Sequence, residues 1–255
     1  MFNSNEYPVL EFDSSMTAVI NPDEEMANNK FETDKLIITF FPEVIEKLKN
    51  EGRVTLERTV AGENPLPVYK FTDDPGVLMI LGTIGCPACG GILDMLTGMG
   101  IRKTMFCGGG GVLDKSIGVG TLLLVEGAIR DEGFSFQYIP ASRVIDADRE
   151  VNARIAAYLD KNGIPYIKGL TWTTDAIYRE TPDRVKKRRE EGAKIVEMEQ
   201  SGNIAVTKFR GTKYGALIYG GDDVSGSDWD RREWRSRNGI RYDLVLLCKT
   251  LLNEI

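Results

Sequence analysis

The chain has 255 residues, 42% hydrophobic and 27% charged, so it can bury a full-sized core as one large domain or two small ones. Its 32 basic and 38 acidic residues give a net charge of −6, which excludes the strongly basic surface that general nucleic-acid binding requires. The lack of histidine excludes Ser-His-Asp and Cys-His catalysis and every zinc motif that contains histidine. Any chemistry must use carboxylates, hydroxyls, thiols, lysine or arginine, and we expect a small-molecule substrate.

Apolar segments are too short to cross a bilayer, because none approaches the roughly 20 residues that a spanning helix needs. The N-terminal segment also lacks the basic stretch followed by an apolar one that is typical of a secretion signal. We therefore expect a soluble, cytoplasmic protein that does not associate with membranes.

Strand-like apolar runs alternate with amphipathic segments, which is the pattern of an α/β layered domain. We expect strands at residues 35–41, 53–60, 68–71, 77–82, 103–107, 120–125, 166–171, 195–196 and 214–219. A helix should follow Cys86, because Pro87 suits a first helical position, a second should begin at Thr181, and the last should span about 242–252. No repeat or linker divides the chain, so we predict one domain over 1–255 with 1–34 as a peripheral segment.

Two polar stretches interrupt this alternation. Residues 21–34 are predicted to form a surface connection. Residues 222–241 are long, charged and contain two tryptophans, which is typical of a lid or binding loop. The alternative is a solvated loop with Trp229 and Trp234 packed beneath it.

The cysteines are Cys86, Cys89, Cys107 and Cys248, and the first two have the C-x-x-C spacing of redox and zinc sites. The predicted helix start at Cys86 would suit a redox centre. Zinc would require two further ligands, yet Cys248 lies in an apolar stripe and Cys107 in a strand. We favour four buried thiols that bind no metal.

Four consecutive glycines, 108–111, follow a predicted strand, and such a run lets a backbone approach a ligand and offer N–H groups to an anion. We expect a ligand loop, with a tight turn between two strands as the alternative. Asp114 stands where both the dinucleotide fingerprint and the Walker loop need glycine, which argues against either nucleotide motif.

Two groups of acids follow predicted strands. Glu197 and Glu199 flank Met198 at a strand-to-helix junction, where carboxylates bind a ligand or cap helix N–H groups. Asp222 and Asp223 follow the strand at 214–219, and the carboxyl ends of strands are where open α/β sheets bind ligands. Adjacent acids are also common in ordinary turns.

The order and spacing of several segments resemble the nucleoside phosphorylase family, which includes uridine phosphorylase and hexameric purine nucleoside phosphorylase. The most specific are the stretch TWTTDAIYRET within 169–181 and VEME at 196–199. Supporting segments lie at 82–87, 119–120, 129–135, 188–192 and 220–225, so the resemblance covers roughly residues 77–225. It implies a three-layer αβα fold with a central mixed sheet, cleavage of a nucleoside to free base and ribose 1-phosphate, and a homo-oligomer, either a dimer or a hexamer. It implies no cofactor, with inorganic phosphate as co-substrate.

The resemblance also implies roles for particular residues. Glu199 would bind the ribose 2′- and 3′-hydroxyls, and Met198 would pack under the sugar. The proton donor to a purine would be Asp222 or Asp223, with Asp222 slightly preferred; pyrimidine enzymes have an arginine at that place, so the base stays open between uracil and a purine. The other residues of the substrate site would be Glu197, Thr173, Ile177, Tyr178 and Arg179.

The phosphate site departs from the family pattern. The early Gly-Asp-Pro-x-x-Arg loop is absent, Phe106 replaces an arginine before the glycines, and Gln137 replaces a histidine near the sugar. The remaining candidates for binding phosphate are Gly109, Gly110, Arg130 and Lys70. These losses leave two alternatives open: a nucleosidase that uses water in place of phosphate, and a non-catalytic nucleoside-binding protein.

Overall fold

A mixed β-sheet runs through the middle of the molecule, in the computed structural model that describes residues 2–62 and 64–255. Its strand order is β11-β10-β8-β12-β7-β3-β6-β5-β4, with β9 paired to β8. The strands are β3 (Lys35–Thr39), β4 (Val54–Val60), β5 (Leu66–Phe71), β6 (Val77–Leu81), β7 (Lys103–Val112), β8 (Leu122–Asp131), β9 (Val144–Asp146), β10 (Tyr166–Thr174), β11 (Ala193–Glu197) and β12 (Lys213–Asp223).

One end of this sheet closes on itself. Strand β11 pairs in parallel with β10 and also pairs antiparallel with β7, where Ile195 lies opposite Val112. Strands β7, β12, β8, β10 and β11 therefore form a closed barrel, and β3, β6, β5 and β4 extend from it as an open sheet. Closure leaves no free edge on the barrel strands.

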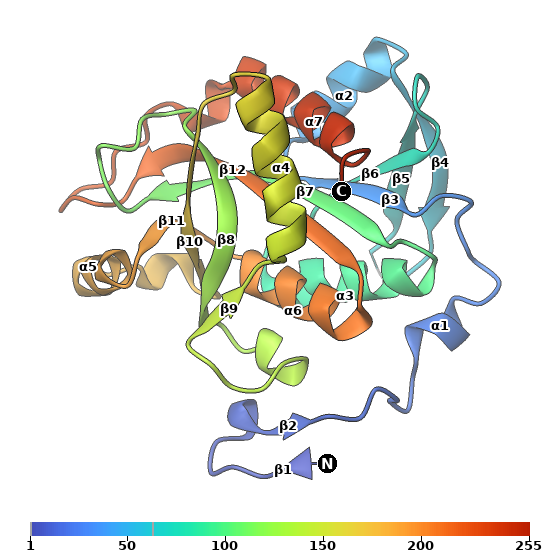
Figure 1. Cartoon of the computed structure of the whole chain (residues 1–255), viewed down its shortest axis with the longest axis horizontal. Coiled ribbons are helices and arrows are strands. Elements are labelled where there is room, and N and C mark those ends of the chain that lie inside the picture. The colour runs from blue at the N-terminus through green and yellow to red at the C-terminus, as the bar shows by residue number, and fades with distance from the viewer. Residues whose placement is uncertain (1, 63) are drawn as a thin grey trace.

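Helices cover both faces of the sheet, which gives the three-layer αβα architecture expected from the sequence (Figure 1). One face carries α2 (Pro42–Asn50), α4 (Arg149–Lys161) and α7 (Asn238–Leu251), and the other carries α3 (Cys86–Gly98) and α6 (Gln200–Arg210). Helix α5 (Pro182–Glu190) packs beside β11. Each face buries its own apolar cluster, so the sheet is covered on both sides.

The N-terminal segment lies on the outside of the α3 and α6 layer (Figure 1). It contains β1 (Phe2–Asn3), the short 3-10 helix η1 (Pro8–Leu10), β2 (Phe12–Asp13) and α1 (Pro22–Glu25). Helix α1 packs on α3, and η1 packs on η2 (Ser135–Gln137). In the described part of the chain, no helix is long and apolar enough to span a membrane.

The four glycines belong to strand β7, so the predictions of a loop or a turn there are both wrong. Packing explains why these positions are glycine. A Cβ atom at Gly110 would collide with the side chain of Ile195, and one at Gly109 would come within 2.8 Å of the Tyr219 ring. The strands on either side approach β7 so closely that only glycine fits.

Candidate active site

The two predicted groups of acids follow strands that both pair with β7. Val196 of β11 pairs with Gly111, and Gly220 of β12 pairs with Gly110. The glycine run of β7 is therefore the part of the sheet to which both strands are attached.

Glu197 uses its carboxylate inside the protein. One oxygen accepts a hydrogen bond from the Thr173 hydroxyl, and the other accepts from the backbone N–H groups of Glu199 and Gln200, at 2.6 and 2.7 Å. The side chain is 7% exposed. Glu197 therefore holds the N-terminus of α6, and Thr173 holds Glu197, so the structure does not direct either side chain to the base.

Glu199 stands at the junction between β11 and α6 and is 6% exposed. Its Oε1 accepts a hydrogen bond of 2.8 Å from the backbone N–H of Gly85, in the loop between β6 and α3. Gly85 has φ of 97°, a conformation that side chains disfavour. The loop after β6 thus holds the Glu199 carboxyl through this hydrogen bond. The neighbouring Met198 is half-buried.

Both glutamates keep their protons to a higher pH than ordinary carboxyls do. Burial raises the pKa of Glu197 to about 7, although its hydrogen-bond donors oppose the shift. Burial and the neighbouring Glu197 raise the pKa of Glu199 to about 8. Because Glu197 receives more donors, it carries the charge and Glu199 carries the proton.

The raised pKa values of Glu197 and Glu199 predict that the stability of the folded protein depends on pH. The ordinary pKa of both groups is 4.5, so at pH 5–8 the folded protein holds a proton that the unfolded chain has released. The stabilisation is complete below pH 4.5 and is lost as pH rises through 7–8. We expect the Tm of the wild type to fall across this range more steeply than that of Glu199→Gln, measured by thermal unfolding. Parallel curves for the two proteins would contradict the raised pKa of Glu199.

Another buried acid, Glu132, connects η2 with helix α6. Its carboxylate accepts hydrogen bonds from the Ser201 hydroxyl, at 3.0 Å, and the Ser135 backbone N–H, at 2.9 Å. It thereby ties η2 to the first turn of α6. The sequence reasoning assigned Glu132 no role, although it lies within the family-like segment 129–135.

The guanidinium group of Arg130 is engaged by the loop that follows it. It donates to the Ser135 hydroxyl at 2.8 Å and to the carbonyls of Pro140 and Ile139 at 2.7 and 3.0 Å. Burial lowers the pKa of Arg130. The sequence proposed this residue for phosphate, and in this structure its donors bind the protein itself.

Lys70 lies on β5, which β3 and β6 separate from the barrel strand β7. Its ammonium group forms an ion pair of 2.7 Å with Glu57. The structure therefore does not bring Lys70 to the acids, whereas Gly109 and Gly110 pair with Tyr219 and Gly220 of β12, the strand that ends in Asp222 and Asp223.

Asp222 and Asp223 differ in their surroundings. Asp222 is half-buried and accepts a hydrogen bond of 2.6 Å from the Trp229 indole; burial raises its pKa. Burial alone would raise the pKa of Asp223 too, but hydrogen bonds from Ser225 and an ion pair with Arg232 hold it below its usual value. The Asp223 carboxylate thus binds residues of the loop that follows β12, and Asp222 is the acid suited to release a proton.

Residues Ile177–Arg179, which the family resemblance implies at the base of the substrate, form the short 3-10 helix η3 and are exposed. We call residues 177–180 the base segment. Tyr178 is 95% exposed. The next residue, Glu180, is half-buried; burial and the nearby Asp222 raise its pKa to about 7, while Arg184 opposes the shift. The base segment therefore places a second carboxyl beside Asp222. Trp229, which we expected either in a lid or packed under the loop, is largely exposed and donates to Asp222.

The four cysteines are buried and unpaired, as expected. Burial raises the pKa of Cys86, so it stays a thiol beside the Ser201 hydroxyl at 3.7 Å. Among the described residues, no three acidic or cysteine side chains are grouped in a way that would hold a metal ion.

The fold is a three-layer αβα arrangement whose sheet closes into a barrel at one end. A family model described as the phosphorylase superfamily matches residues 34–241, and the chain belongs to this superfamily. This confirms the resemblance found from the sequence.

Individual relatives differ in the reaction that their names describe. Guanosine phosphorylase from Halorubrum lacusprofundi is 25% identical over 159 residues, which span 62% of this chain and 66% of that protein. A uridine phosphorylase structure from Vibrio fischeri has a TM-score of 0.70 and 19% identity, over 89% of this chain and 92% of that one. Futalosine hydrolase from Helicobacter pylori has a TM-score of 0.71 and 18% identity, over 88% and 98% of the two chains. At these identities the two structures show the shared fold alone.

Proposed function

We propose that this protein cleaves the N-glycosidic bond of a nucleoside. The proposal is supported by the superfamily match over residues 34–241 and by two carboxyls, Glu199 and Asp222, that follow strands paired with β7 and whose pKa values are raised by burial. The sugar would lie against Glu199, and the base would lie between Asp222 and the segment 177–180.

Glu199 would bind the ribose 2′- and 3′-hydroxyls. As the bond breaks, the sugar gains positive charge, and a carboxylate next to it stabilises that charge more than it stabilises the neutral substrate. The proton on Glu199 leaves as the hydroxyls bind, because they supply the donors that the buried carboxylate lacks. The backbone N–H of Gly85 then keeps the carboxylate in place.

Asp222 would protonate the departing base. The base becomes electron-rich as the bond breaks, so a proton donor beside it lowers the barrier. Burial raises the pKa of Asp222, which favours the protonated form, and the Trp229 indole keeps its carboxyl in one orientation. The product would be a free base, and the acid in this position supports a purine.

Two acceptors for the sugar follow from different observations. Phosphate is the acceptor implied by the name of the guanosine phosphorylase relative, and it would give ribose 1-phosphate. Water is supported by the geometry, because Arg130 and Lys70 bind partners within the protein. We favour water on this ground.

The acceptor is tested by a panel of purine nucleosides and uridine, assayed with and without phosphate. We expect base release that is unchanged when phosphate is removed, with ribose as the sugar product. Release that requires phosphate would instead assign the phosphorylase reaction. Saturable nucleoside binding by calorimetry, without any release of base, would make the protein a binding protein and would contradict the proposed cleavage.

A further inference from the structure

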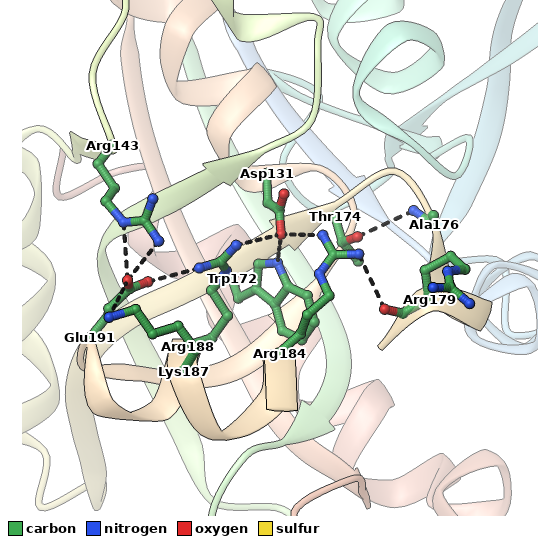
Figure 2. Close-up of polar contacts among 10 residues, drawn as sticks. All are labelled: Asp131, Arg143, Trp172, Thr174, Ala176, Arg179, Arg184, Lys187, Arg188 and Glu191. Carbon is green, nitrogen blue, oxygen red and sulfur yellow. Dashed lines mark hydrogen bonds and ion pairs between the residues drawn. The ribbon is translucent and has the colours of Figure 1, made fainter. Parts of the chain in front are cut away.

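An ion-pair cluster lies next to the base segment, centred on Asp131 at the end of β8 (Figure 2). The Asp131 carboxylate accepts hydrogen bonds of 2.9 Å from the Trp172 indole and from Arg188 of α5. Arg184, also of α5, donates to the same oxygen from the other side. Burial alone would raise the pKa of Asp131, but the two arginines and the indole hold it below its usual value.

Arg184 differs from Arg188 because it also reaches the base segment. Its second terminal nitrogen donates to the backbone carbonyl of Arg179, at 3.1 Å (Figure 2). Arg179 ends η3, and Glu180 follows it. The planar guanidinium fork thus joins the end of β8 to the end of η3, a two-partner geometry that lysine cannot reproduce.

The other half of the cluster does not reach the base segment. Glu191, at the C-terminal end of α5, accepts hydrogen bonds from Arg143 at 2.6 Å and from Arg188 at 3.0 Å. These contacts hold the far end of α5 against the loop before β9 (Figure 2). The contacts of Glu191 therefore anchor helix α5, whereas the contacts of Arg184 anchor η3.

We propose that Arg184 is a positioning residue, which ties segment 177–180 to Asp131 so that the bound base faces Asp222. The proposal rests on the proposed function for its catalytic consequence. The structural part of the proposal does not depend on the proposed function. Apart from Arg184, η3 is held just before its start, where the Asp175 carboxylate accepts a hydrogen bond of 3.1 Å from the Gly133 N–H. Among the described residues, the hydrogen bonds that the end of η3 would keep without Arg184 are those of its own turns.

The test compares Arg184→Ala, Arg184→Lys and Asp131→Asn with the matched control Arg143→Ala. The control removes an ion pair from the same cluster and leaves the Arg184 bridge intact. Arg184→Ala and Asp131→Asn should raise KM for the nucleoside about tenfold, the factor expected for one lost charge-assisted hydrogen bond, with kcat changed by less. Arg184→Lys should restore only part of the loss, and Arg143→Ala should leave KM unchanged.

Hydrogen exchange of the free protein supplies a second readout that needs no activity. Exchange at the amides of residues 177–181 should accelerate in Arg184→Ala and Asp131→Asn, and should be unchanged in Arg143→Ala. An unchanged KM and unchanged exchange in folded Arg184→Ala, or equal effects in Arg143→Ala, would overturn the proposal. If the wild type releases no base, the proposed function fails, whereas the exchange result still decides whether Arg184 anchors η3.

Discussion

Replacing Glu199 with glutamine should lower kcat for base release by about 100-fold, with a smaller change in KM. Glutamine has nearly the same shape, and its oxygen can still accept the N–H of Gly85. It cannot carry the negative charge that stabilises the cationic sugar of the transition state. Steady-state kinetics on the best purine nucleoside measure the effect near neutral pH and at saturating substrate, where the bound hydroxyls favour the ionised Glu199 carboxylate.

The control is Glu190→Gln on the exposed side of α5, which makes the same chemical change away from the site. It should keep wild-type kinetics. If Glu199→Gln is folded and also keeps wild-type kcat, then Glu199 does not stabilise the sugar and the proposed mechanism is wrong.

Replacing Asp222 with asparagine should lower kcat for purine nucleosides by about 100-fold or more, because the base must then leave without a proton. A ribosyl substrate whose leaving group needs no proton, such as 4-nitrophenyl riboside, should lose far less. This contrast separates proton donation from a general disturbance of the site. Equal losses for both substrates would assign Asp222 a structural role.

Asp223→Asn is the matched neighbour for this experiment. Asp223 pairs with Arg232 and caps the turn at Ser225, so its loss should lower Tm and affect kcat much less than Asp222→Asn. A larger kcat loss in Asp223→Asn than in Asp222→Asn would exchange the roles of the two residues.

The layered fold could be predicted from the sequence where its local signals are strong. Helix α3 begins at Cys86 as expected, because Pro87 stands at its first turn and an apolar face follows. A helix was expected after the strand-to-helix junction at Glu197 and Glu199, and α6 begins there at Gln200. Its extent was not predicted, because all of its first eight residues are buried, polar ones included, so no amphipathic pattern marks it. Helix α4 was missed, although Asp148 caps it by accepting from the N–H groups of Glu150 and Val151.

The candidate site was predictable as a set of residues but not as a set of contacts. The family resemblance placed Glu197 and Glu199 together in the substrate site, with Glu199 as the sugar ligand. Only the hydrogen bonds show that Glu197 holds α6 while Glu199 is left for a ligand. In the same way, the sequence does not distinguish Asp222 from its neighbour Asp223. The structure does, because Arg232, nine positions after Asp223, forms an ion pair with Asp223. Partners this far along the chain leave no local pattern.

The glycine run of β7 allows β11 and β12 to lie against the same strand, because a Cβ atom at Gly109 or Gly110 would collide with Tyr219 or Ile195. The pairing itself comes from ladder hydrogen bonds, which do not depend on the identity of the neighbouring side chains. Evolution can therefore exchange residues in the segments that follow β11 and β12 while both strands keep their places beside β7.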